Sequence, residues 1–127
     1  MKRLILSDFM EDGAGRLFVR LLDDWGRWER SGTGIHGFSR GCLEAPKFID
    51  DDSALIVNRA YGRLCKREIK YANLIRLRYI VKLDTVDIVR LAERNIPAEM
   101  VIASLNEATK MLFNEIENVC RDLSITI

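Results

Sequence analysis

The sequence predicts an all-α fold, a compact helical bundle that ends in a helix-turn-helix. We expect an N-terminal helix over residues 12–30, basic helices over 53–82, and a short helix followed by a long one over 83–121, because apolar residues recur there at helical spacing. A Gly-rich connection with an acidic cap, over residues 31–52, separates the first helix from the rest. Apolar residues make up 48% of the 127 residues, enough for one core, so we expect a single domain over residues 1–127.

The first expected helix has an apolar face that includes two tryptophans. Trp25 and Trp28 lie about one turn apart, and aromatic side chains of this size bury much apolar area. We interpret them as core anchors, with an exposed partner-binding patch as the alternative. The apolar face comprises Leu17, Phe18, Leu21, Leu22, Trp25 and Trp28, and Asp23, Asp24, Arg27 and Glu29 are expected mostly on the other side.

The connection over residues 31–46 contains four glycines and ends at Pro46, a composition typical of a surface loop. No Gly-Lys-Ser/Thr sequence ends this run, so the glycines do not match a phosphate-binding loop. His36, the only histidine, has no acidic or nucleophilic residue beside it, and we expect no catalytic role for it.

Asp50, Asp51 and Asp52 form an acidic triplet that allows two interpretations. Carboxylates suit the magnesium ion of a nuclease, but adjacent side chains rarely point at one ion, and no further carboxylate cluster is near in the sequence. Aspartate and Ser53 side chains also accept hydrogen bonds from the free amides at a helix start, where negative charge is favourable. We favour helix capping and keep the metal-dependent nuclease as the alternative.

The helix after this cap is expected to place apolar residues inward and basic residues toward solvent. A second helix is expected over residues 68–80, with a break between Lys66 and Lys70. The expected inward residues are Leu55, Ile56, Ala60 and Leu64, and the expected exposed basic residues are Arg59, Arg63, Lys66 and Arg67.

The charges are unevenly distributed although the net charge is only +1. Residues 47–82 hold nine basic against four acidic residues, whereas residues 83–127 hold four basic against eight acidic ones. A basic block of this kind is typical of a surface that lies along a polyanion and releases its counterions. Such a basic block is equally typical of a solvent-exposed helix face whose charge is offset by the acidic segment that follows.

The cysteines and the hydropathy of the sequence argue against a disulfide-rich, zinc-binding or membrane-spanning protein. Cys42, Cys65 and Cys120 are odd in number and far apart, which favours free thiols in a reducing cytoplasm over a disulfide frame. A zinc site would need nearly all of them together with His36, so we expect no metal site. No stretch approaches the roughly 20 apolar residues of a membrane span. We expect no catalytic residue and no cofactor.

Residues 83–121 carry the most specific helical pattern. Asp84 or Thr85 can cap a short helix over residues 85–94, and Pro97 and Glu99 suit the first turn of a second helix. The short helix has two possible inward faces, either Val86, Val89 and Ala92 or Ile88 and Leu91. In the long helix, apolar residues recur at spacings of four, three, four and four, namely Val101, Leu105, Ala108, Leu112 and Ile116, and Val119 extends this inward stripe.

Several groups of residues form one recognisable pattern. They are Trp25-Gly26-Arg27-Trp28, the Gly-rich gap, Asp50-Asp51-Asp52-Ser53-Ala54-Leu55-Ile56, Gly62-Arg63-Leu64-Cys65-Lys66, and the helix pair that ends at Ile116. The pattern, which runs over residues 20–121, resembles the Q antitermination proteins of lambdoid bacteriophages, in their small form without a zinc site. The tryptophan pair and the acidic triplet are its most specific points. The second half is also similar to the sigma-factor region that reads the −35 promoter element.

This resemblance implies a regulator of late phage genes. Proteins of this family bind a DNA element beside the late promoter, load onto RNA polymerase during an early pause and hinder terminator hairpins. They catalyse no reaction. By resemblance we therefore expect double-stranded DNA and bacterial RNA polymerase, with or without its sigma factor, as partners, and the cytoplasm of a bacterial host as the location. The sequence leaves the oligomeric state open.

The helix-turn-helix plan assigns DNA contacts, because the start of its second helix enters the major groove. In that position Asn106 suits adenine, Glu99 suits cytosine, and alanine methyl groups can contact thymine. The expected base-reading residues are Ala98, Glu99, Ile102, Ala103 and Asn106. The expected phosphate contacts are Lys82, Thr85, Arg90, Arg94 and Lys110, together with Arg59, Arg63, Lys66 and Arg67 of the basic helices.

The second helix differs in charge from the DNA-reading helix of sigma factors, and this difference leaves other functions open. Groove-entering positions of sigma-type helices are often basic or glutamine, whereas the second helix here is weakly charged. Either its affinity for DNA is modest without polymerase, or this helix packs on protein and the basic stretch 59–78 meets DNA. Two further functions stay possible at this point: a promoter-binding regulator that acts only at initiation, and a protein-interaction module without DNA binding.

Overall fold

The structure is a computed structural model that describes residues 9–10, 13, 15–30, 51–92 and 96–123. Within these ranges the regular secondary structure is helical throughout, without a β-strand, which confirms the all-α prediction. The Gly-rich connection with His36 and Cys42 lies outside the described residues, and so do Asp50 and Arg94.

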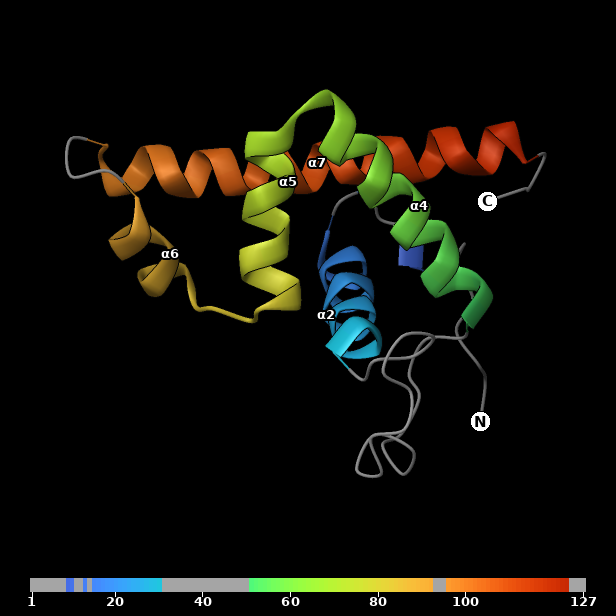
Figure 1. Cartoon of the computed structure of the whole chain (residues 1–127), viewed down its shortest axis with the longest axis horizontal. Coiled ribbons are helices and arrows are strands. Elements are labelled where there is room, and N and C mark those ends of the chain that lie inside the picture. The colour runs from blue at the N-terminus through green and yellow to red at the C-terminus, as the bar shows by residue number, and fades with distance from the viewer. Residues whose placement is uncertain (1–8, 11–12, 14, 31–50, 93–95, 124–127) are drawn as a thin grey trace.

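One long helix organises the described chain (Figure 1). This helix, α7, is crossed by α4 toward its C-terminal end and by α5 near its middle, while α6 lies beside its beginning, at the end remote from α4. Helix α2 packs below, against η1 and α4. The elements are α2 (Arg16–Arg30), α4 (Asp51–Arg67), α5 (Ile69–Ile75), the π-helical η1 (Arg76–Ile80), α6 (Thr85–Leu91) and α7 (Ala98–Asp122).

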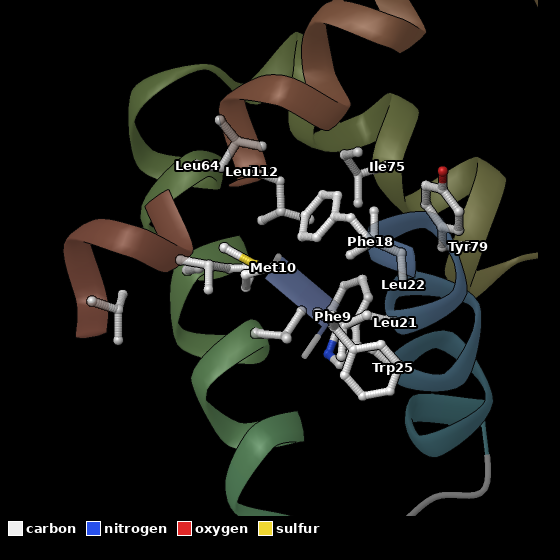
Figure 2. Close-up of a cluster of buried hydrophobic side chains, with 14 of the residues drawn as sticks. Phe9, Met10, Phe18, Leu21, Leu22, Trp25, Leu64, Ile75, Tyr79 and Leu112 are labelled. Carbon is white, nitrogen blue, oxygen red and sulfur yellow. The ribbon is translucent and has the colours of Figure 1, made fainter. Parts of the chain in front are cut away.

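The inward stripe of α7 is confirmed. Its six predicted residues are all buried, since a spacing of three and four keeps them on one helical face. Most of them join a main core together with α2, α4, α5 and the π turn. Figure 2 shows Trp25, Phe18 and Leu112 pointing into this core beside Phe9 and Met10.

Both tryptophans of α2 pack in or against the main core. Trp25 is fully buried, and Trp28 packs against the edge of the same core. The indole Nε1 of Trp28 donates a hydrogen bond to Asp51 Oδ1 at 2.9 Å, which ties the end of α2 to the start of α4. The tryptophan pair and the acidic triplet, the two most specific points of the sequence pattern, are therefore in direct contact.

The predicted faces of three helices need correction. Leu55 is 54% exposed because α4 places Ala54 and Val57 inward instead. Asp24, expected on the polar side of α2, is only 8% exposed. Neither predicted face of α6 is right, because Ile88 is its buried residue while Val86 and Leu91 are exposed and Val89 and Ala92 are partly buried.

Several predicted boundaries also shift. Helix α2 begins at Arg16 and not at residue 12, and α6 ends at Leu91 and not at residue 94. Helix α4 begins at Asp51, so Asp51 and Asp52 occupy its first turn, where negative charge is favourable. The break between the basic helices falls at Glu68, inside the predicted interval.

The crossing of α2 and η1 is unusually close. A Cβ atom at Gly26 would overlap the carbonyl oxygen of Tyr79, so only glycine fits this crossing. One turn further along, Arg30 Nη1 donates to the Tyr79 carbonyl at 2.8 Å and to the Ile80 carbonyl at 3.3 Å. These bonds satisfy carbonyls at the end of the π turn, which would otherwise lack partners in the helix.

No helix in the described ranges is both long and apolar enough to cross a membrane. In the same part of the chain, no three His, Cys, Asp or Glu side chains lie close enough to hold a metal ion.

Candidate nucleic-acid interface

The leading turns of α7 are exposed. Among the described helices, α6 lies alongside this end of α7, which extends away from α4 (Figure 1). The five predicted base-reading residues, Ala98, Glu99, Ile102, Ala103 and Asn106, are all exposed to solvent. Spacings of four, three and four place Glu99, Ala103, Asn106 and Lys110 on one face, which lies opposite the buried stripe.

A pocket of about 350 Å³ opens beside this face. It brings together three residues that the sequence assigned to DNA contact, namely Thr85, Asn106 and Lys110. The π turn adds Arg78, the last residue of the basic stretch 59–78, which the sequence did not single out by itself. The remaining lining residues are Val19, Tyr79, Leu105 and Thr109.

Arg78 and Tyr79 reach the pocket from the π turn. Such turns are rare insertions within helices and occur often at functional sites. The guanidinium carbon of Arg78 lies 5.4 Å from the centre of the Tyr79 ring, a cation–π arrangement that restricts the side chain. The sequence indicates neither the π turn nor the contact of Arg78 with this pocket.

The pocket wall also includes Tyr79 and Thr109, two buried, uncharged residues that each carry a hydroxyl group. Thr109 Oγ1 donates to the Leu105 carbonyl at 3.0 Å. Burial raises the pKa of Tyr79, although Thr109 and Arg78 act in the opposite direction, so the phenol stays protonated at neutral pH.

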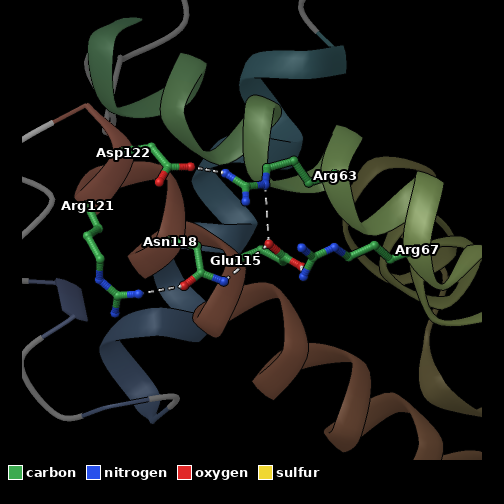
Figure 3. A network of polar contacts seen from close by, with 6 residues as sticks. All are labelled: Arg63, Arg67, Glu115, Asn118, Arg121 and Asp122. Carbon is green, nitrogen blue, oxygen red and sulfur yellow. Dashed lines mark hydrogen bonds and ion pairs between the residues drawn. The ribbon is translucent and has the colours of Figure 1, made fainter.

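Arg63 and Arg67, predicted phosphate contacts, form ion pairs within the fold (Figure 3). Arg63 Nε lies 3.4 Å from Glu115 Oε1, and Arg67 Nη1 lies 3.0 Å from Glu115 Oε2. Arg63 Nη1 also pairs with Asp122 Oδ2 at 2.7 Å. Because the Glu115 side chain is 7% exposed, its charge needs these partners, and both arginines are accounted for by the packing of α4 on α7.

The other described residues that were predicted to contact phosphate do not line the pocket. Arg59 and Lys66 are exposed on α4 but do not line the pocket. Lys82 is exposed in the turn before α6 and has a left-handed backbone with φ of 67°, and Arg90 is exposed near the end of α6. The structure therefore separates the basic side chains of α4 from the group formed by Arg78, Thr85, Asn106 and Lys110.

Several large apolar side chains in α6, in the first turns of α7 and between these helices are exposed to solvent. Met100 and Ile102 in the first turns of α7 are 60% and 43% exposed, and Leu91 at the end of α6 is 65% exposed. Val86 and Ile96 are also exposed. Five of the nine large exposed apolar residues in the described part of the chain therefore fall between residues 86 and 102.

The connection between α6 and α7 differs from the common helix-turn-helix plan. Residues 92–97 separate the two helices, whereas the turn of the motif usually has three or four residues. The pair of helices is present, but its use as a DNA-binding helix-turn-helix stays a prediction.

Comparisons with known protein families, with curated proteins and with solved structures found no match to this chain.

Proposed function

We propose that this protein is a DNA-binding regulator of transcription, and that it acts as an antitermination factor of the phage type that its sequence resembles. The observation that carries the proposal is the pocket in which Arg78, Thr85, Asn106 and Lys110 meet beside the exposed leading turns of α7. These polar and basic groups lie beside the exposed helix face that begins at Glu99.

This arrangement supports groove binding. A helix with small outward residues such as Ala98 and Ala103 can approach base edges closely, and the major groove is wide enough to admit it. Basic groups beside such a helix suit the phosphates that border the groove, which fix the register of a bound protein. Glu99 and Asn106 are the polar groups on the helix face that suit base recognition.

The polymerase part of the proposal rests on the exposed apolar side chains. Leu91, Met100 and Ile102 are large, exposed and close in sequence to the proposed DNA contacts. Phosphates give such residues little to contact, whereas a protein partner buries them. A factor that loads onto polymerase at a DNA site needs both kinds of surface.

DNA binding is tested first with the purified chain and a fluorescent duplex from a late-promoter region. We expect a measurable affinity that falls steeply with rising salt, because bound phosphates release counterions. Asn106→Ala should relax the preference for the specific duplex, while Lys110→Ala should weaken binding to specific and random duplexes alike. Equal effects of both substitutions on both duplexes would remove Asn106 from base recognition.

Transcription in vitro then separates antitermination from control of initiation. A template with a candidate promoter and a downstream terminator is transcribed with and without the protein. Antitermination predicts a larger fraction of readthrough transcripts that depends on the DNA site. A regulator of initiation changes the number of transcripts and leaves the readthrough fraction constant.

The exposed apolar side chains also favour a second candidate, a protein-interaction module that does not bind DNA. In that case the basic groups are solvated surface, and the two helices after residue 83 only pack on each other. This candidate predicts no binding of the duplex at any salt concentration and loss of partner binding in Met100→Ser.

A further inference from the structure

The pocket between the π turn and α7 is chemically suited to an anion. Two cationic side chains, Arg78 and Lys110, line it together with the hydroxyl of Thr85 and the amide of Asn106. All four can donate hydrogen bonds, and no acidic residue is among the described residues that line the pocket. These donors come from η1, α6 and α7, so the fold assembles the site from separate segments.

The strongest donor of the pocket lies against a buried side chain. The guanidinium of Arg78 makes a cation–π contact with the Tyr79 ring, and Tyr79 is only 5% exposed. A planar guanidinium in a fixed position suits the two oxygens of a phosphate group, because it can donate two parallel hydrogen bonds. Lys110 supplies a second charge on a flexible stem.

The pocket has room for a phosphate group. Its volume of about 350 Å³ lies at the lower end of the range for small-molecule sites. This volume is about ten times the roughly 30 Å³ share of one water molecule, so a phosphate group with part of its sugar fits. Val19 and Leu105 give the pocket an apolar part that suits the carbon atoms of a sugar.

The position of the pocket, beside the exposed face of α7, favours a phosphate of the DNA backbone as the ligand. Asn106 and Lys110 belong both to the pocket lining and to the exposed helix face that begins at Glu99. A helix in the major groove has backbone phosphates at its flank, and contacts to them fix its register.

We infer that this pocket seats one phosphodiester group of the DNA backbone, held by Arg78, Thr85 and Lys110, and thereby fixes how far α7 enters the groove. This inference rests on the proposed DNA binding and adds to it a defined phosphate contact, with Arg78 as its main residue. Tyr79 and Thr109 act as positioning residues that hold the pocket wall in shape.

Substitutions that each remove one positive charge, inside or outside the pocket, test whether the pocket binds a DNA phosphate. The affinity of the full chain for the specific duplex is measured for Arg78→Gln and Lys110→Gln, with Arg76→Gln and Lys70→Gln as controls on exposed side chains that do not line the pocket. We expect a loss of roughly tenfold for each pocket variant, because a hydrogen bond to a charged group contributes that much. The controls should lose no more than about twofold, and each pocket variant should reduce the salt dependence by about one counterion.

Arg78→Lys tests whether the planar guanidinium matters, because lysine keeps the positive charge but cannot donate two parallel hydrogen bonds. We expect its affinity to lie between that of the wild-type protein and that of Arg78→Gln. Circular dichroism and thermal unfolding establish that each variant is folded. Equal losses in pocket and control variants, or a larger loss in Lys66→Gln than in Arg78→Gln, would overturn the inference in favour of the basic helices.

Replacing single phosphates of the duplex by uncharged methylphosphonates locates the contact. We expect one position at which the replacement weakens the wild-type protein but not Arg78→Gln, since the two changes remove the same contact. If the wild-type protein binds the duplex and no such position exists, the pocket is not a phosphate site although the proposed function stands.

A wild-type protein that binds no duplex would overturn the proposed function and, with it, the assignment of the phosphate to DNA. NMR titration of the wild-type protein with inorganic phosphate then tests the anion chemistry separately. Shifts at the amides of Thr85 and Thr109 that Arg78→Gln abolishes would support phosphate recognition, and their absence would contradict it.

Discussion

The two halves of α7 share one apolar period but differ in what covers them. In the trailing half, Leu112, Ile116 and Val119 are at most 1% exposed, because α2, α4 and α5 surround them. In the leading half, Val101 and Leu105 remain 6% and 8% exposed, in a small cluster around Ile88 of α6. The difference teaches that helical spacing selects the face that turns inward, while the number of neighbouring helices decides how deeply that face is buried.

Paired leucine substitutions on α7 measure this difference, and they should give the largest effect. Leu112→Ala leaves a cavity in the main core and should lower the free energy of unfolding by about 3 to 4 kcal/mol. Leu105→Ala lies in the small cluster, which can relax around it, and should cost about 2 kcal/mol or less. Urea unfolding followed by circular dichroism gives both values. An equal or larger cost for Leu105→Ala would show that the two clusters are one cooperative core.

A pair of glycines tests how the core supports the pocket. Gly26→Ala would force a methyl group against the Tyr79 carbonyl and should destabilise the protein by about 1 to 3 kcal/mol. Because Tyr79 lines the pocket, this variant should also lose affinity for DNA.

Gly62 in α4 is the matched control, since a Cβ atom there meets no described atom within 4 Å. Gly62→Ala should stabilise the protein by about 0.5 to 1 kcal/mol, because alanine is the better helix former. Thermal unfolding of both variants separates steric overlap from helix propensity. A stable Gly26→Ala variant would contradict the close crossing.

The ion pairs at Glu115 belong to the trailing half only. Glu115→Ala leaves Arg63 and Arg67 without this partner and should cost about 1 to 2 kcal/mol, since the carboxylate is buried while both arginines are partly exposed. Asp122→Ala removes an exposed pair and should change the stability by less than about 0.5 kcal/mol. Denaturation at low and high salt checks both values. DNA affinity should stay constant in Glu115→Ala if the α4 face is structural.

The smallest effect concerns the buried carboxyl group of Asp24 on α2. Burial raises the pKa of its carboxyl above the ordinary value of 3.8, although Arg20 and Arg27 act in the opposite direction. The folded state therefore binds the proton more tightly than the unfolded state, and this contribution to stability is complete below pH 3.8 and is lost as the pH rises through the folded pKa. Asp24→Asn removes the titration.

The difference in stability between Asp24→Asn and the wild-type protein should consequently shift in favour of the variant as the pH rises toward neutrality. Urea unfolding at a series of pH values measures it. Glu29, whose pKa burial also raises, is unchanged in both proteins and cancels in the difference. A difference that stays constant with pH would contradict the buried, destabilised carboxylate.

Long regular patterns made the fold predictable, and short ones did not. The 25-residue helix α7 repeats its apolar positions often enough to fix one face. Helix α6 has seven residues with apolar side chains around much of its circumference, so its sequence does not specify which of Val86, Ile88 or Leu91 turns inward. In α4, the continuous apolar run from Ala54 to Val57 leaves the same ambiguity, and the packing partners decide it.

The candidate site was predictable in part for similar reasons. Asn106 was predicted as a base-reading residue and Thr85 and Lys110 as phosphate contacts, and the structure gathers all three in one pocket. Arg78 was included only as part of the basic stretch 59–78, because the sequence does not show that a π turn brings this residue to the pocket. The sequence also cannot reveal that Arg67 pairs with Glu115, since 48 residues separate them along the chain.

Amide hydrogen exchange of the full chain, with and without the specific duplex, tests most directly whether the leading half of α7 is the DNA-binding surface. We predict that DNA slows exchange at residues 78–85 and 98–110, while exchange at residues 112–120 and in α4 changes little. Slower exchange confined to residues 51–67, or no change anywhere when the duplex is bound, would contradict this account.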